Sequence, residues 1–279
     1  MNPWNMKIVA DSSCDIFSLE SVPFASAPLR IITDEKEYVD DQHLDVAQMV
    51  DDLLSYSGKS GTACPGTGDW LDAFGDASYV FCVTITSNLS GSFNSARVAK
   101  QEYEEMYPDR HVFVIDSLSA GPELNLIIEK LQELILAGKT YEEICTEITE
   151  YQQHGDLLFM LESLKNLANN GRVSKLVASA AGILGIRMVG KASEQGTLEP
   201  LNKCRGEKKA LPTIVQLMDK YGYKGGKVRI AHCINPEAAA KLKSLILEKF
   251  ASAEIKIYTC GALCSFYAEK GGMLIGFEK

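Results

Sequence analysis

Short apolar runs alternate with longer amphipathic segments through the first half of this 279-residue chain. The apolar runs have the length and composition of strands, and the amphipathic segments repeat their apolar residues at helical spacing. We expect strands at 7–10, 79–85 and 111–115 and helices at 45–56, 93–107, 123–137 and 140–153. Such alternation predicts a parallel sheet covered by helices on both faces, with ligands gathering at the carboxyl ends of the strands.

The second half of the chain has a different pattern. Glu194-Gln195-Gly196 is typical of a hairpin turn, and Pro236 suits the first position of a helix capped by Asn235. We expect strands at 157–161, 187–192, 197–202, 228–233, 255–260 and 273–277, and helices around 165 and 177, at 208–221 and from 236 onward. These elements predict a mixed sheet with helices on one face.

The two patterns together predict an α/β protein of two domains. The N-terminal domain, residues 1–154, would contain the parallel sheet, and the C-terminal domain, residues 155–279, would contain the mixed sheet. No Pro-rich or Ser-rich linker marks the boundary. We therefore expect the two domains to pack closely.

The charge of the chain argues against nucleic acid as a partner. Its formal net charge is -9, whereas nucleic-acid binding draws on clustered Lys and Arg that neutralise phosphates. The first residues lack the apolar core of a signal peptide, and the longest apolar stretch, 176–186, is far shorter than the ~20 residues that span a bilayer. The sequence predicts a cytoplasmic protein with no transmembrane segment.

Catalytic and metal-binding templates do not fit the sequence. The eight cysteines form no Cys-x-x-Cys pair, and the four histidines lack metal-ligand spacing. Gly58-Lys59-Ser60 and Gly138-Lys139-Thr140 look like the ends of phosphate loops, but Leu53 and Glu133 stand where such a loop needs its first glycine. Ser90 does not lie in the Gly-x-Ser-x-Gly turn of a hydrolase. We expect no metal and no cofactor.

The clearest candidate site follows the predicted strand at 79–85. Residues 86–92 contain four hydroxyl side chains and Gly91, and a helical pattern begins directly after them. Free backbone N–H groups at a helix start, next to hydroxyls such as that of Ser90, can bind one anionic head group. The alternative is that these polar residues only cap the helix.

Three other segments are open to two interpretations each. Asp11-Ser12-Ser13 and Asp15 follow the first strand and could bind a ligand or form a turn that closes the strand. Gly171 and Arg172 could contribute to a site or end a helix, with Arg172 compensating the helix dipole. The small apolar residues of 176–186 could wall an apolar tunnel or pack in a core.

Several short motifs follow one another along nearly the whole chain. They are Lys7-Ile8-Val9-Ala10-Asp11-Ser12, Gly61-Thr62-Ala63-Cys64-Pro65, Ser87-Asn88-Leu89-Ser90-Gly91-Ser92, Val114-Ile115-Asp116-Ser117, Leu161-Glu162-Ser163-Leu164-Lys165, Gly171-Arg172-Val173-Ser174 and Lys203-Cys204-Arg205-Gly206. Each motif is weak alone, but the ordered set resembles that of the DegV family of bacterial fatty-acid-binding proteins.

The resemblance implies a lipid-binding protein rather than an enzyme. Such a protein holds one long-chain fatty acid between its two domains and presents the carboxylate to a separate fatty-acid kinase, which makes the acyl phosphate used in phospholipid synthesis. By motif, Thr62 and Ser90, with Gly91, would bind the carboxylate. Arg172 and Arg205 would lie near the mouth and act in the encounter with the kinase or in phosphoryl transfer.

The sequence departs from the family pattern near its C-terminus. Similar proteins carry His-x-Gly-Pro-Gly there, whereas this chain reads Tyr267-Ala268-Glu269-Lys270-Gly271. Tyr267 can still donate a hydrogen bond to the carboxylate but cannot become cationic, and Ala63 lacks the hydroxyl usual beside Thr62. A regulatory or interaction protein with an altered or lost lipid site is therefore an alternative, and a small-molecule kinase or transferase is another.

Overall fold

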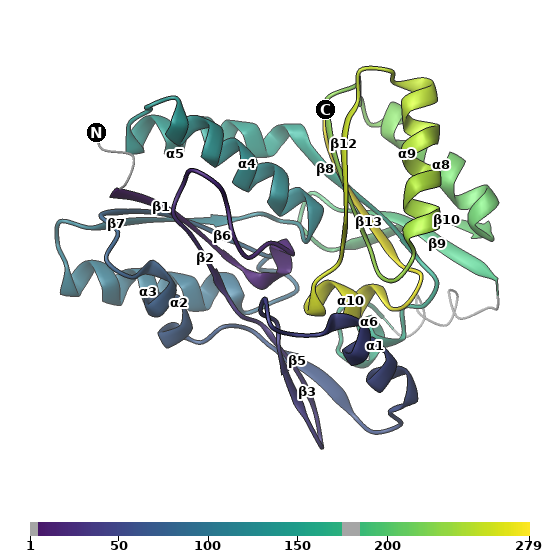
Figure 1. Cartoon of the computed structure of the whole chain (residues 1–279), viewed down its shortest axis with the longest axis horizontal. Coiled ribbons are helices and arrows are strands. Elements are labelled where there is room, and N and C mark those ends of the chain that lie inside the picture. Colours follow the sequence, from purple (N-terminus) through teal and green to yellow (C-terminus); the bar gives the residue numbers. More distant parts are fainter. Residues whose placement is uncertain (1–4, 175–184) are drawn as a thin grey trace.

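The computed structural model describes residues 5–174 and 185–279, which form three sheets with surrounding helices (Figure 1). The first sheet has the strand order β2-β1-β6-β7, and every pair in it is parallel. Its strands are β1 (Met6–Asp11), β2 (Phe24–Ala27), β6 (Tyr79–Thr84) and β7 (His111–Asp116). The parallel sheet predicted from the first half of the sequence is confirmed.

Helices cover both faces of this sheet, as predicted. Neighbouring side chains of β1 point to opposite faces, so Ile8 packs under one pair of helices and Val9 under the other. Ile8 faces α4 (Pro122–Leu136) and α5 (Tyr141–Tyr151), and Val9 faces α2 (Thr67–Phe74) and α3 (Ser92–Met106). Thr140 and Glu143 form a capping box at the start of α5.

The second sheet is mixed, with the order β10-β9-β8-β13-β11-β12. Only β11 and β12 pair in parallel, and the other neighbours are antiparallel. Gly196 lies in the predicted hairpin turn between β9 and β10, where its N–H bonds to the carbonyl of Ser193. The strands are β8 (Gly155–Leu161), β9 (Ile186–Ala192), β10 (Leu198–Arg205), β11 (Lys227–His232), β12 (Glu254–Thr259) and β13 (Met273–Glu278).

Helices cover both faces of the second sheet, so the prediction of one covered face was wrong. The expected pair, α8 (Glu207–Lys220) and α9 (Pro236–Lys249), packs on one face. The short helices α6 (Lys165–Asn169) and α10 (Ala262–Ala268) pack on the other. Six of the seven residues of α10 are buried, so this helix has no polar face and no amphipathic pattern to reveal it.

The start of α9 also differs in detail from the prediction. Asn235 occupies the N-cap position, but its side chain makes no capping hydrogen bond. Instead its amide donates to the side chain of Glu207 and to the carbonyl of Gly271. Asn235 therefore ties α9 to α8 and to the loop before β13.

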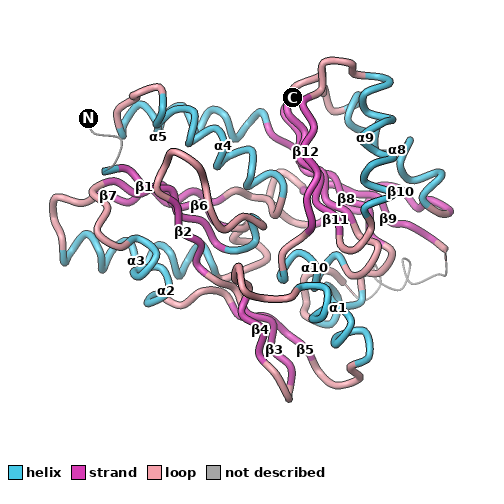
Figure 2. The backbone as a smooth tube through the Cα atoms, viewed as in Figure 1, coloured by secondary structure: helices cyan, strands magenta, loops and turns pink. Residues whose placement is uncertain are grey.

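A small third sheet was missed by the sequence analysis. Its strands are antiparallel in the order β4-β3-β5, and it protrudes beside α1 (Figure 2). Ile31 of β3 and Met49 of α1 are fully buried in one cluster with Phe266 of α10. The elements are β3 (Arg30–Thr33), β4 (Glu37–Val39), β5 (Ser60–Ala63) and α1 (Val46–Ser55). A segment from the first half of the chain thus packs against the second sheet's helices.

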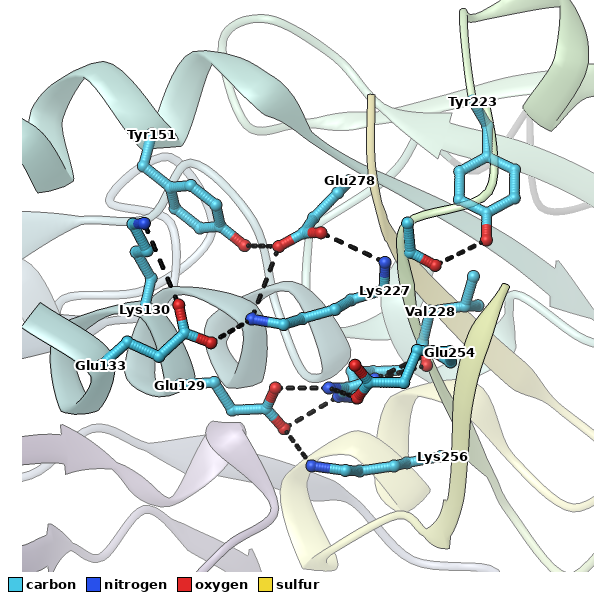
Figure 3. Close-up of polar contacts among 12 residues, drawn as sticks. Glu129, Lys130, Glu133, Tyr151, Tyr223, Lys227, Val228, Glu254, Lys256 and Glu278 are labelled. Carbon is cyan, nitrogen blue, oxygen red and sulfur yellow. Dashed lines mark hydrogen bonds and ion pairs between the residues drawn. The ribbon is translucent and has the colours of Figure 1, made fainter. Parts of the chain in front are cut away.

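Helix α4 joins the two larger sheets, because it contacts strands of both. At its start, a Cβ on Gly276 of β13 would lie 2.8 Å from the backbone of Pro122, so only glycine permits this close approach. Further along, Glu129 of α4 pairs with Arg229, whose side chain is 1% exposed, and Glu133 pairs with Lys227 (Figure 3). The buried Arg229 thus ties β11 to α4, and the more exposed pair of Lys227 and Glu133 joins the same two elements.

Candidate functional site

An apolar cavity lies where the carboxyl ends of β6 and β7 face the second sheet. It contains about 820 Å³ of space outside protein atoms, which includes its opening to solvent. Most lining side chains are aliphatic or aromatic. The lining residues are Leu29, Thr62, Ile85, Thr86, Leu89, Ser90, Ser119, Ala120, Leu157, Phe159, Leu161, Leu167, Arg172, Ala192, Gly196, Thr197, Leu198, Leu263, Cys264, Tyr267, Ala268 and Leu274.

Strand β8 supplies one wall of the cavity. Leu157, Phe159 and Leu161 alternate along the strand and line the cavity, whereas Leu158 and Met160 point into the core under α8 and α9. Phe159 pairs with Gly190 of β9, where a Cβ would lie 2.3 Å from the phenyl ring. Glycine at this position therefore leaves room for the Phe159 ring on the cavity wall.

A group of polar side chains lies at one part of this apolar surface. Thr62 of β5 and Tyr267 of α10 share a hydrogen bond of 2.8 Å between their hydroxyl oxygens. The guanidinium carbon of Arg172 lies 5.8 Å from the centre of the Tyr267 ring, and Ser90 lines the same cavity. The structure thus brings Thr62, Ser90, Arg172 and Tyr267 to one cavity from four separate segments.

The loop after β6 presents Ser90 just before α3 begins. Gly91 takes the N-cap position, and the Ser90 hydroxyl accepts a hydrogen bond of 3.2 Å from the N–H of Ser92. A hydroxyl that accepts one bond keeps its own proton to donate, so stabilising the helix start and binding an anion are compatible. A Cβ on Gly91 would lie 3.1 Å from the Cys64 sulfur, so glycine allows this loop to approach the end of β5.

Arg172 follows α6 and links the two sides of the cavity. Gly171 has a φ of 75° and ends the helix, which is one of the two interpretations that the sequence left open, and the N–H of Arg172 bonds to the carbonyl of Leu167. The Arg172 side chain donates to the carbonyl of Leu89 at 3.1 Å and to that of Asn170 at 2.6 Å. The positive charge of Arg172 therefore lies against the carbonyl of Leu89, the residue before Ser90, and beside the Tyr267 ring.

Tyr267 is the neutral donor of this group. Burial raises the pKa of its phenol, and the Thr62 hydroxyl and the charge of Arg172 lower it by smaller amounts, so the net shift is upward. The hydroxyls of Thr62 and Tyr267 have one proton each, and one of these two protons is used in the hydrogen bond between them. The second proton can be donated to an anion, next to the positive charge of Arg172.

Glu269 does not direct its charge at this pair of hydroxyls. Its carboxylate accepts hydrogen bonds from the Ser163 hydroxyl at 2.9 Å and from the N–H of Asn166 at 3.1 Å. These bonds tie the end of α10 to the start of α6. Glu269, whose charge departs from the family pattern, thus has its hydrogen-bond partners on Ser163 and Asn166.

Two other predicted features lie apart from the cavity. Arg205 is exposed at the end of β10 and is not among the described residues that line the cavity. Of the apolar stretch 176–186, residues 176–184 lie outside the described residues. The described ranges 5–174 and 185–279 include no cluster of three or more His, Cys, Asp or Glu suited to a metal ion, and none of their helices is long and apolar enough to cross a membrane.

The sequence analysis missed the apolar half of the site. Leu263, Cys264 and Ala268 enter the cavity from α10, and Leu29 enters just before β3. Both segments are short and lack periodic patterning, so no local signal marks them. The run of apolar residues at 157–161 was recognised as a strand, but without alternation it does not indicate which side chains face a ligand.

Comparisons with known proteins agree with this geometry. The family model described as "Uncharacterised protein, DegV family" matches residues 5–279. A DegV domain-containing protein of Streptococcus pneumoniae is 47% identical over 276 residues, which cover 98% of each chain.

Two solved structures match over 98% of this chain and 99% of their own. A DegV family protein from Eubacterium eligens, loaded with heptadecanoic acid, is 48% identical with a TM-score of 0.97. The Fatty Acid Kinase (Fak) B3 protein of Streptococcus pneumoniae, loaded with linoleic acid, is 46% identical with a TM-score of 0.96. With the family model, these matches show that the chain belongs to the DegV family.

Proposed function

We propose that this protein binds one long-chain fatty acid and presents its carboxylate to a separate fatty-acid kinase. The observation that carries the proposal is an apolar cavity that includes the hydrogen-bonded pair of Thr62 and Tyr267 beside Arg172. An apolar wall suits an acyl chain, and hydroxyl donors next to a cation suit a carboxylate. The fatty acids in the two similar solved structures support the same ligand class.

In this proposal, Ser90 and one hydroxyl of the hydrogen-bonded pair of Thr62 and Tyr267 donate hydrogen bonds to the carboxylate, and Gly91 lets the start of α3 approach it. Arg172 lies near the carboxylate and contributes positive charge. Arg205 is exposed, so its role would be in contact with the kinase rather than with the buried acyl chain. The partner kinase would make the acyl phosphate from the carboxylate that this protein holds, and the cytoplasm is the expected place of action.

The acyl chain should dominate affinity, and the head group should set orientation. Burial of ~14 methylenes at ~0.8 kcal/mol each provides about 11 kcal/mol before ordering costs. Each hydrogen bond to the charged carboxylate adds about 1.5–3 kcal/mol. We therefore expect the protein to retain lipid when one head-group contact is removed, but to hold its carboxylate less well.

The proposed domains are residues 1–154 and 155–279, with the ligand between them. The cavity supports this division, because its walls come from loops after β6 and β7 on one side and from β8, β9, β10 and β13 on the other. The third sheet is an exception to this division, because α1 and β3 belong to the first range but pack against α10 of the second. Because Thr62 lies on β5, residues 1–154 also contribute to the part of the cavity proposed for the carboxylate.

The test is denaturing mass spectrometry of lipid carried by protein purified from cells. A fatty acid at a ratio near one to one is expected. Protein that is empty and takes up no added fatty acid would overturn the proposal and favour the regulatory alternative. A kinase assay with a cognate fatty-acid kinase then tests presentation, and the isolated chain should hydrolyse no ATP, because it lacks a phosphate loop.

A further inference from the structure

Three buried carboxylates lie around the end of β1, outside the lining of the cavity. Asp11 ends the strand, Asp15 follows the short 3-10 turn Ser12–Cys14, and Asp40 follows β4. Asp11 and Asp40 are at most 1% exposed. The segment 11–15 therefore forms the turn that the sequence allowed, but its acidic side chains reach elements far away in the chain.

Asp11 holds the loop that carries Ser90. Its carboxylate accepts the N–H of Ile85 at 2.9 Å and the hydroxyl of Ser92 at 2.5 Å. Ile85 directly follows β6, and Ser92 is the first residue of α3. Both ends of the loop 86–91 are thus fixed to one side chain.

Asp40 and Asp15 hold the start of α10, which carries Tyr267. Asp40 accepts the N–H groups of Ala262 at 2.8 Å and Leu263 at 3.1 Å. Asp15 accepts the N–H of Gly261 at 2.8 Å. These backbone groups have no partners within a helix, so the two acids cap α10 from outside it.

Ser12 connects the two attachments. Its hydroxyl donates to Asp40 at 2.9 Å and accepts the N–H of Leu29, a residue of the cavity wall, at 3.0 Å. Ser12 and Asp11 are adjacent in the chain, so a rigid stretch of backbone joins the support of Ser90 to the support of Tyr267. We call Asp11, Ser12, Asp15 and Asp40 the acidic hub.

We propose that the acidic hub sets the separation between Ser90 and Tyr267 and so positions the two arms that bind the fatty-acid carboxylate. This inference rests on the proposed function. The hub residues are positioning residues, because they act through the loop 86–91 and through α10 and lie outside the cavity lining.

The experiment compares hexadecanoic acid with hexadecan-1-ol, which has the same tail and no carboxylate. Both are titrated into delipidated wild type, Asp40→Asn, Tyr267→Phe and the double variant. Asp40→Asn replaces one acceptor oxygen of the pair that binds Ala262 and Leu263 with an amide donor. Glu123→Gln is the matched control, because Glu123 is also a buried carboxyl and its side-chain partner, Ser119, lies outside α10 and outside the loop 86–91.

The proposal predicts that Asp40→Asn weakens acid binding a few-fold, by no more than Tyr267→Phe does, and weakens alcohol binding less than about twofold. In the Tyr267→Phe background, Asp40→Asn should have no further effect on acid binding, because the phenol through which it acts is gone. Glu123→Gln should leave the ratio of acid to alcohol affinity unchanged. The same cycle with Asp11→Asn and Ser90→Ala should give the same non-additivity.

Equal weakening of acid and alcohol binding, or an Asp40→Asn effect that is the same with and without the Tyr267 hydroxyl, would overturn the positioning role. If Asp40→Asn does not fold, Ser12→Ala replaces it, because this variant removes one neutral contact to Asp40 and keeps the carboxylate. Failure of the proposed function itself looks different. In that case wild-type protein would bind the acid no better than the alcohol, or would bind neither.

Discussion

The two ends of the cavity are built in different ways. Its apolar walls come from a sheet face, in which Leu157, Phe159 and Leu161 lie on one regular strand. Its polar end comes from a loop, a short helix and a three-stranded sheet, which supply Ser90, Tyr267 and Thr62. The sheet face supplies apolar surface from a regular strand, whereas the polar end depends on hydrogen bonds between distant segments. The comparison teaches that affinity and orientation are separable in this protein.

The largest effect on lipid binding should come from filling the apolar part of the cavity. Leu274→Trp places an indole in space proposed for the acyl chain, because Leu274 lines the cavity from β13. We expect lipid occupancy to fall by at least about tenfold, since several buried methylenes at ~0.8 kcal/mol each are displaced. Denaturing mass spectrometry measures the occupancy. The control is Leu54→Trp on α1, where the side chain is 59% exposed, and retention of full occupancy by Leu274→Trp would contradict the assignment of the tail.

The second prediction concerns pH, because the acidic hub is titratable and the apolar wall is not. Burial raises the pKa of Asp40 to about 6, and it raises the pKa of Asp11 and Asp15 as well. Burial also raises the pKa of Glu123, at the start of α4, to about 7. The folded state thus binds more protons than the unfolded state between the ordinary carboxyl pKa and these values, so the free energy of unfolding falls as pH rises.

The free energy of unfolding should fall by a few kcal/mol between about pH 4 and pH 7, since one pKa unit corresponds to about 1.4 kcal/mol. Urea unfolding at a series of pH values measures it. Glu123→Gln should flatten the upper part of this dependence and Asp40→Asn the lower part. Stability that rises steadily across the same range would show that these carboxyl groups are not buried as described.

The third prediction tests the orientation of the carboxylate separately from the amount of bound lipid. Ser90→Ala should lower acyl-phosphate formation with a cognate kinase by about tenfold, the equivalent of one hydrogen bond to a charged group. Lipid occupancy should stay within about threefold of wild type, because the tail supplies most of the binding. Ser87→Ala, an exposed serine of the same loop, is the control. Loss of all lipid from Ser90→Ala would contradict the separation of the two roles.

The smallest effect is expected at the phenol. Tyr267→Phe removes one hydroxyl while keeping the ring beside Arg172, so acid binding should weaken by a few-fold, or about 1 kcal/mol. Alcohol binding serves as the internal comparison. Tyr267→His should strengthen acid binding below about pH 6.5, where a histidine becomes cationic. Acid binding by Tyr267→His that does not change with pH would place the carboxylate elsewhere.

The sequence predicts the parts of this fold that repeat a local pattern. Three strands of the parallel sheet, β1, β6 and β7, and the helices α3, α4 and α5 follow from apolar spacing, and the polar residues after β6 mark a strand end. The fourth strand, β2, was not expected from the sequence. Ser90 could therefore be proposed as an anion receptor from its neighbours alone. Thr62 and Tyr267 required the family resemblance, because β5 has four residues and α10 has seven.

Long-range contacts explain what the sequence could not reveal. Asp40 belongs to none of the candidate site segments in the sequence, and its partners at 262 and 263 are more than 220 residues away. Phe159 faces the cavity only because Gly190 on the neighbouring strand leaves space for its ring. Neither relation leaves a local pattern, because each arises only when distant segments pack together.

The most direct test of the account is a crystal structure of the protein with bound hexadecanoic acid. The account predicts that the carboxylate lies within hydrogen-bond distance of the Ser90 hydroxyl and of one hydroxyl of the pair of Thr62 and Tyr267, with the acyl chain along the wall that contains Phe159. A fatty acid bound in the reverse orientation, or bound outside this cavity, would contradict it.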